Sequence, residues 1–125
     1  MNYWQSFYKN IRLHKKIDFP SQFAIFCIGE QKSASNLIEF GCGNARDAYF
    51  FSKYYKNVYP FDKSKFAIAY NKKQFSKSKN LHFHKYDIND KFDFSYIKNK
   101  KKTILVRFFL FLFKNKKIFI FFNLC

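Results

Sequence analysis

The chain has 125 residues, enough for one domain with a buried core, and its 24 basic and 8 acidic residues give a net charge of +16. Such a charge suggests an anionic partner, but only three of the basic residues are arginines, the usual choice for nucleic-acid contacts. The abundance of Lys, Asn, Phe, Ile and Tyr is simply explained by adenine- and thymine-rich codons, so a dedicated nucleic-acid surface is disfavoured.

The three cysteines and three histidines lack the spacing of a zinc site or a disulfide framework. We therefore expect no bound metal, and the cysteine usage suits a reducing cytoplasm. The N-terminus also lacks the charged segment and apolar core of a secretion signal. The cysteines are Cys27, Cys42 and Cys125, and the histidines are His14, His82 and His84.

Residues 1–35 are predicted to form an N-terminal helical segment. Aromatic and aliphatic residues recur at nearly helical spacing over residues 1–17, which predicts an amphipathic helix lying on the main domain. A second short helix is predicted to begin at Pro20, because proline fits the first helical turn, and to end at Gly29.

Residues 36–109 alternate between strand and helix patterns. The pattern predicts an α/β fold, a Rossmann-like half with about four parallel strands and flanking helices. The expected strands are residues 37–40, 57–62, 81–86 and 103–109, and the expected helices are residues 45–55 and 65–75.

Residues 110–125 break this pattern and form an aberrant apolar and basic tail, LFLFKNKKIFIFFNLC. Neither of its apolar patches approaches the roughly 20 residues needed to span a bilayer, so no transmembrane segment is expected. Three interpretations stay open: a truncated or frameshifted ending, a buried pair of strands, or a membrane-surface patch.

The most informative segment is the end of the first predicted strand, where Glu39 precedes Gly41, Cys42 and Gly43. Glycines allow positive φ angles and leave no Cβ between the backbone and a ligand. A strand that turns into a helix through such a loop is typical of a nucleotide-cofactor site.

Two further acids stand at or just beyond strand ends. Asp62 lies 21 residues after Gly41, the distance expected for the end of the next strand, and Asp87 follows the third strand. At the carboxyl edge of a parallel sheet, Asp62 can accept hydrogen bonds from a ribose and Asp87 from an exocyclic amine. Phe61 and Ile88 can flank a base. Each acid alone fits equally well as a helix N-cap.

Arg46 stands where the dinucleotide fingerprint requires a third glycine, so a pyrophosphate would be crowded there. A smaller ligand with one nucleoside and an amino-acid tail fits better.

These residues resemble the first three motifs of class I S-adenosylmethionine-dependent methyltransferases. The wider pattern is similar to a bacterial group of surface-polysaccharide (capsule) biosynthesis methyltransferases. It shares with them an aromatic N-terminus, a Pro-Ser-Gln-Phe-Ala segment at 20–24, a Gly-Cys-Gly-Asn-x-Arg-Asp loop at 41–47 and an Arg-Phe-Phe-Leu segment at 107–110.

The resemblance implies S-adenosyl-L-methionine as the cofactor, bound by nine residues. The loop of Gly41, Cys42 and Gly43 would hold its methionine part, Asp62 its ribose, and Asp87 with Ile88 its adenine, while Gln22 and Arg46 would reach its carboxylate. Glu39 is the ninth of these residues. It also implies methyl transfer to a sugar or small-molecule acceptor. Catalytic residues are not identified.

The chain departs from the family pattern in two places. Ala45 replaces the commoner third glycine of the first motif, and only four of seven strands are found. We therefore expect an incomplete Rossmann-like methyltransferase fold, C-terminally truncated, cytoplasmic and inactive alone, with self-association through an exposed sheet edge. The alternatives are a non-catalytic truncated product and a small basic protein that binds anionic membranes or nucleic acid.

Overall fold

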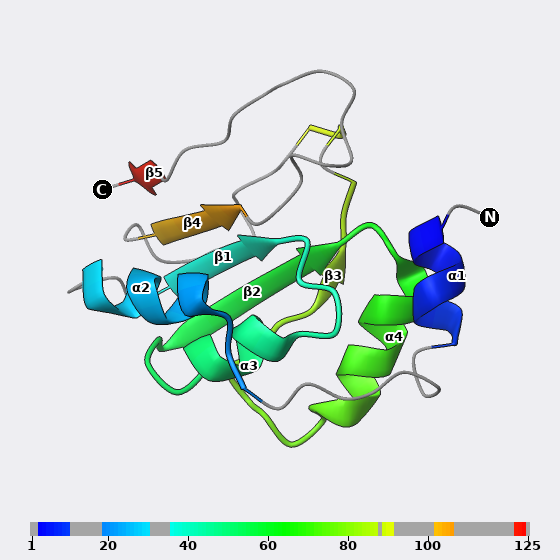
Figure 1. The fold of residues 1–125 in the computed structure, drawn as a ribbon, viewed down its shortest axis with the longest axis horizontal. Coiled ribbons are helices and arrows are strands. Elements are labelled where there is room, and N and C mark those ends of the chain that lie inside the picture. The colour runs from blue at the N-terminus through cyan, green and yellow to red at the C-terminus, as the bar shows by residue number, and fades with distance from the viewer. Residues whose placement is uncertain are drawn as a thin grey trace.

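The computed structural model of the chain describes residues 3–10, 19–30, 36–87, 89–91, 102–106 and 122–124. Their strands form a five-stranded sheet in the order β3-β2-β1-β4-β5 (Figure 1). The strands are β1 (Asn36–Phe40), β2 (Asn57–Asp62), β3 (His84–Lys85), β4 (Lys102–Val106) and β5 (Phe122–Leu124). The helices are α1 (Tyr3–Lys9), α2 (Gln22–Glu30), α3 (Arg46–Phe51) and α4 (Lys65–Gln74).

Strand β1 is the centre of the sheet. It pairs in parallel with β2 and β4, with Phe40 opposite both Phe61 and Val106, and β2 pairs in parallel with β3. The predicted α/β fold with four parallel strands and flanking helices is confirmed. A fifth strand comes from the tail, where β5 pairs antiparallel with β4 and sets Leu124 opposite Lys102.

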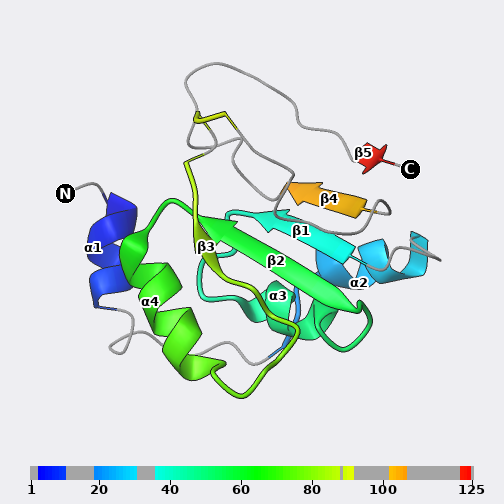
Figure 2. The same ribbon diagram turned by 180° about the vertical axis from the view of Figure 1, so that it is seen from behind.

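The strands alternate their side chains between two apolar clusters. Leu37 and Val58 belong to the larger cluster, which α2, α3 and α4 cover from one face of the sheet (Figures 1 and 2). Neighbouring strand residues project to the opposite face and form a smaller, mostly aromatic cluster of Ile38, Phe40, Phe61, Tyr59 and Tyr86. The stacked rings of Phe40 and Phe61, 5.5 Å apart, join β1 to β2 on that face.

The predicted boundaries of the second helix are wrong at both ends. Helix α2 begins at Gln22, because the Ser21 hydroxyl accepts a hydrogen bond from the Ala24 N–H at 3.2 Å and so caps the helix. Pro20 therefore precedes the cap and does not lie in the first turn. Gly29 does not end the helix, which continues to Glu30.

Other elements are shorter than expected. The helix predicted over 45–55 is α3, which ends at Phe51, and the third strand keeps its ladder only at His84–Lys85, with a single bridge from Leu81 to Val58. Two predicted segments lie outside the described residues. They are much of the first predicted helix, from residue 11 on, and the end of the fourth strand, residues 107–109. The domain boundaries after residues 35 and 109 stay predictions.

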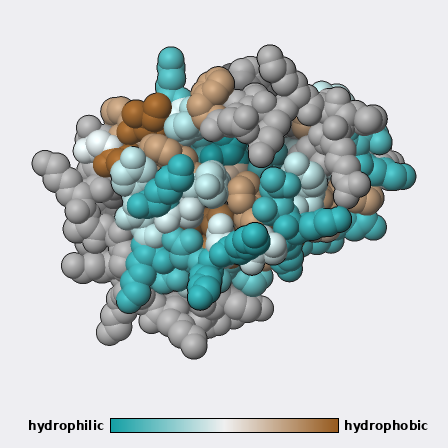
Figure 3. Space-filling view, turned by 90° about the horizontal axis from the view of Figure 1, so that it is seen from below, coloured by the Kyte–Doolittle hydropathy of each residue, from teal (hydrophilic) through white to brown (hydrophobic). Residues whose placement is uncertain are grey.

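The face seen from below in Figure 1 is mostly hydrophilic (Figure 3). Apolar side chains gather on the side where α2 lies, in keeping with the exposed fractions of Ile25 and Phe26, 55% and 57%. Some exposed apolar surface is normal in a globular protein. In the part of the chain that the structure describes, the helices are too short or too polar to cross a bilayer.

The buried ring of Phe51 links α3 to the larger cluster, and its side chain has no exposed surface. We expect Phe51→Ala to lower the free energy of unfolding by about 3–5 kcal/mol, because the substitution removes buried contacts and leaves a cavity. Urea unfolding followed by circular dichroism measures the change. Tyr54→Ala, at a ring that is 60% exposed, is the control and should cost about 0.5 kcal/mol or less. Equal losses in both variants would contradict the described core.

Candidate functional site

The loop after β1 bends sharply and stays attached to β2. The backbone N–H groups of Gly41 and Cys42 both donate to the Phe61 carbonyl, at 2.7 and 3.0 Å. Positive φ angles occur at Gly41 (76°), Gly43 (55°) and Ala45 (64°). A left-handed conformation costs an L-residue about 1–2 kcal/mol, which explains why a third glycine would suit the position of Ala45.

Gly43 is held on both sides. Its N–H donates to Asp62 Oδ2 at 2.9 Å, and its carbonyl accepts a hydrogen bond from Asn71 Nδ2 at 2.7 Å. The hydroxyl of Tyr8, on α1, lies where a Cβ on Gly43 would be. Both the positive φ and the close approach of Tyr8 therefore favour glycine here.

The carboxylate of Asp62 joins the loop to the beginning of α4. Its second oxygen, Oδ1, accepts a hydrogen bond from the Ser64 N–H at 2.8 Å. Burial raises the pKa of Asp62 above its usual value, and the N–H groups of Ser64 and Gly43 oppose that rise. The cap of α4 is Ser64, whose hydroxyl accepts from the Ala67 N–H, so the N-cap interpretation of Asp62 is wrong.

Helix α1 lies beside this edge of the sheet and packs on α4. The Ser64 hydroxyl donates to Gln5 Oε1 at 3.1 Å, which fixes α1 to the first turn of α4. Together with the Tyr8 contact at Gly43, this bond places α1 over the end of β2.

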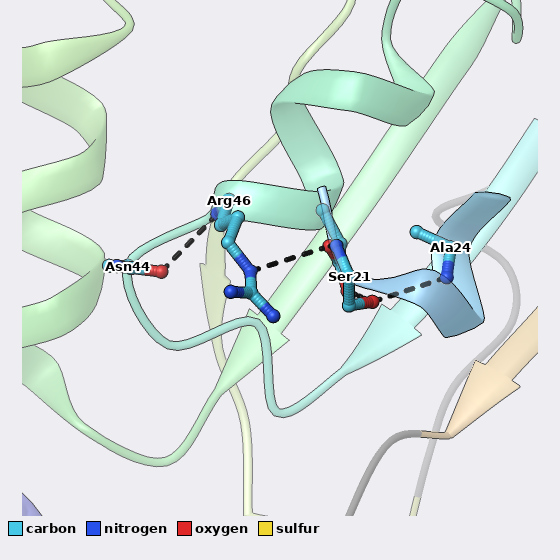
Figure 4. A network of polar contacts seen from close by, with 5 residues as sticks. Ser21, Ala24, Asn44 and Arg46 are labelled. Atoms are coloured by element: carbon cyan, nitrogen blue, oxygen red, sulfur yellow. Dashed lines mark hydrogen bonds and ion pairs between the residues drawn. The ribbon is translucent and has the colours of Figure 1, made fainter. Parts of the chain in front are cut away.

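A second polar network joins α2 to α3 (Figure 4). The Asp47 carboxylate is 1% exposed and accepts hydrogen bonds from the N–H and the hydroxyl of Ser21, at 2.8 and 2.7 Å. Arg46 Nε lies 3.7 Å from the same carboxylate. The network thereby links the beginning of α3, where Arg46 lies, to the beginning of α2, where the exposed Gln22 follows Ser21.

Asp87 lies at the same edge, since the Tyr86 N–H donates to the carbonyl of Asp62. Its carboxylate contacts Lys63 Nζ at 3.2 Å and accepts from the Asn89 N–H at 3.0 Å. The N–H of Asn89, and to a smaller degree Lys63, lower the pKa of Asp87. Ile88 lies outside the described residues.

Glu39 and the Cys42 side chain lie in the interior below the loop. Burial raises the pKa of the Cys42 thiol well above its usual value, and the charge of Glu39 raises it further. Burial likewise raises the pKa of Cys27 to about 11. The Cys42 thiol therefore packs in the core, while its N–H and carbonyl are bound within the loop and to β2.

The sequence did not predict a place in the site for Gln5, Asn71, Asp47 and Ser21, and it predicted Tyr8 only as part of a covering helix. The aromatic spacing of residues 1–17 and the Pro-Ser-Gln-Phe-Ala segment were usable signals for α1 and Ser21. No sign of a role for Asn71 is visible in the sequence, because two lysines and a glutamine follow it on α4 and an asparagine beside such residues does not stand out.

A cavity of about 350 Å³ opens elsewhere, along β3 and the end of α4, where Lys72, Phe75 and His84 are among its lining residues. It belongs to the edge strand and does not include the glycine loop. The candidate site is defined instead by the loop, Asp62 and the parts of α1 and α2 that contact them.

Comparison with known proteins identifies a family and the fold. A family model described as tellurite resistance protein TehB matches residues 2–123. No curated protein matches the chain at a significant level.

Several solved structures share the fold. A chain of the complex between the Haloferax volcanii Trm112 methyltransferase activator and the putative methyltransferase aligns with a TM-score of 0.58 at 12% identity, over 73% of this chain and 42% of that chain. The phosphoethanolamine N-methyltransferase 1 of Haemonchus contortus aligns at 0.55 and 13% identity, over 73% and 22%. An S-adenosylmethionine-dependent methyltransferase of Anabaena variabilis aligns at 0.51 and 21% identity, over 68% and 36%.

The chain thus spans less than half the length of each of these three proteins. Their shared fold and the family match confirm the predicted class I S-adenosylmethionine-dependent methyltransferase fold, and with it S-adenosyl-L-methionine as the cofactor of that class. The expected capsule-polysaccharide role and truncation stay predictions.

The positive φ of Gly43 and the nearby Tyr8 hydroxyl lead to a test of the loop. We expect Gly43→Ala to destabilise the chain by more than about 1 kcal/mol, because a left-handed L-residue is unfavourable and its Cβ meets Tyr8. Adding Tyr8→Phe should restore part of the loss.

Gly29→Ala is the control, because Gly29 is helical with open space around it. Alanine there should stabilise the chain by about 0.5–1 kcal/mol. Thermal unfolding measures all three, and an unchanged Gly43→Ala variant would contradict this loop geometry.

The link between Ser21 and Asp47 leads to a second test. We expect a double-mutant cycle with Ser21→Ala and Asp47→Asn to give a coupling energy of about 1.5–3 kcal/mol, as for hydrogen bonds to a charged group. Urea unfolding of the four proteins measures it. Additive losses would show that α2 and α3 are not joined through this pair.

Proposed function

Since the chain belongs to the TehB family, we propose that it binds S-adenosyl-L-methionine at the glycine loop, as the cofactor-binding part of a class I methyltransferase. One observation carries this proposal. The left-handed loop after β1 is held by Asp62, so a Cβ-free backbone and a strand-end carboxylate meet at the carboxyl edge of a parallel sheet. Ligands of open α/β sheets bind at that edge.

The glycine loop suits the methionine part of the cofactor. Gly41 and Gly43 let a ligand approach the backbone closely, and Cys42 between them would line the ligand with its backbone while its N–H stays bound to Phe61. Glu39, buried beneath the loop, supports it from the core side.

Asp62 suits the ribose. Each carboxylate oxygen already accepts one backbone N–H, and a carboxylate oxygen has a second acceptor direction that a ribose hydroxyl can use. The two backbone bonds hold the carboxylate in place, so little freedom is lost when the sugar binds.

The remaining predicted contacts complete the proposed site. Asp87 with Ile88 would contact the adenine, and Gln22 with Arg46 would reach the carboxylate of the methionine part. The Ser21–Asp47 network supports the last pair, because it fixes the beginnings of α2 and α3 relative to each other.

When bound, the cofactor supplies a methyl group on a sulfonium for in-line transfer to an oxygen or nitrogen nucleophile. The contribution of these residues is to position that methyl group. We also propose, from the sequence resemblance, that the acceptor is a sugar or another small molecule of surface-polysaccharide biosynthesis. A transfer assay against such sugars tests the acceptor separately from cofactor binding.

Asp62→Ala tests the cofactor site. We expect titration calorimetry with S-adenosylhomocysteine to detect binding by the wild-type chain and a loss of more than about 100-fold in the variant, because two hydrogen bonds to a charged group disappear. Circular dichroism should be unchanged. Because the pKa of Asp62 is raised, wild-type affinity should also begin to fall at a higher pH than for an ordinary aspartate as the solution is acidified.

Asp90→Ala is the matched control, since Asp90 is an exposed aspartate at the same end of the sheet. Unchanged affinity in Asp62→Ala would contradict the proposal. So would a folded wild-type chain that binds no S-adenosylhomocysteine but binds DNA or anionic vesicles in a salt-sensitive way.

A further inference from the structure

Asn71 is a fully buried polar residue in the middle of α4 and has 0% exposed surface. Its Nδ2 donates a 2.7 Å hydrogen bond to the carbonyl of Gly43, 28 residues away in the chain, and lies 4.0 Å from Cys42 Sγ. The side chain therefore reaches from the helix to the apex of the glycine loop.

This bond completes the orientation of a residue with little conformational preference of its own. Glycine samples positive and negative φ about equally. The N–H of Gly43 is bound by Asp62 from β2 and its carbonyl by Asn71 from α4. Two side chains from different elements thus select one conformation of the loop.

The hydrogen bond from Asn71 to the Gly43 carbonyl also sets the direction of the Asn44 N–H. A trans peptide is planar, with its carbonyl and its N–H on opposite sides. Because the Gly43 carbonyl points to Asn71, the N–H of Asn44 in the same peptide group points to the opposite side of the loop. An N–H held in that direction is suited to an anionic group such as a carboxylate.

Asn71 is not an obvious choice for stability alone. Among the described residues its Oδ1 has no hydrogen-bond partner, although the side chain is buried. A buried amide oxygen without a partner is unfavourable, so an apolar residue would suit the core better. The donor Nδ2 is the part of the side chain that the loop uses.

We infer that Asn71 is a positioning residue for the amino-acid end of the cofactor, acting through the Gly43–Asn44 peptide group. The inference rests on the proposed function. It makes Asn71 responsible for affinity toward the carboxylate-bearing part of the ligand, whereas Asp62 acts on the nucleoside.

Two ligands separate these roles. S-adenosylhomocysteine carries the amino-acid end, and 5′-methylthioadenosine lacks it. We expect Asn71→Leu to weaken S-adenosylhomocysteine binding about tenfold or more, the effect of losing one hydrogen bond to a charged group, while the affinity for 5′-methylthioadenosine changes less than about twofold. Asn71→Ala, which also removes the donor, should behave in the same way.

Asn80→Leu is the matched control. Asn80 Nδ2 also donates a 2.7 Å hydrogen bond to a backbone carbonyl, that of Ser52, but away from the loop. Asn80→Leu should lower thermal stability without changing the ratio of the affinities for S-adenosylhomocysteine and 5′-methylthioadenosine.

Three results would overturn the inference. They are equal losses of affinity for both ligands, an unchanged S-adenosylhomocysteine affinity in a folded Asn71 variant, and failure of both Asn71 variants to fold. In each of these cases the wild-type chain still binds S-adenosylhomocysteine, so the proposed function stands. A wild-type chain that binds neither ligand overturns the proposed function, and the inference with it.

Discussion

The hydrogen bond from the Gly43 N–H to the Asp62 carboxylate is the contact on which the site depends. It ties the loop after the central strand to the end of the neighbouring strand, where parallel pairing has already brought the two chain segments together. It adds to the two bonds that the Phe61 carbonyl accepts from Gly41 and Cys42, and it is the bond from the end of β2 that holds Gly43 itself. The same carboxylate also binds the Ser64 N–H and so joins the loop to the residue that caps α4.

The N-terminal helices are attached to this arrangement through polar contacts. Helix α1 is held by Gln5 at Ser64 and by Tyr8 at Gly43, and α2 is held by Ser21 at Asp47. These contacts join segments that lie far apart in the chain. They make α1 part of the site, where the sequence had suggested only a covering helix over residues 1–17.

The agreement between sequence and structure is best where a pattern has a local physical cause. Alternating strand and helix patterns predicted β1, β2 and α4 nearly to the residue, because buried strands and amphipathic helices differ in their apolar spacing. The ends of α2 and the length of the third strand were wrong, since a serine cap and the edge position of β3 decided them.

The sequence by itself determined the fold class, the glycine loop and the strand-end position of Asp62, because short-range steric rules govern where glycine and acids can stand around a strand end. Only the tertiary structure decided that Asn71 and Tyr8 meet Gly43 and that Asp47 binds Ser21. The physical reason is that such pairs depend on how helices pack against the sheet, and no spacing along the chain encodes the direction in which a buried polar side chain points.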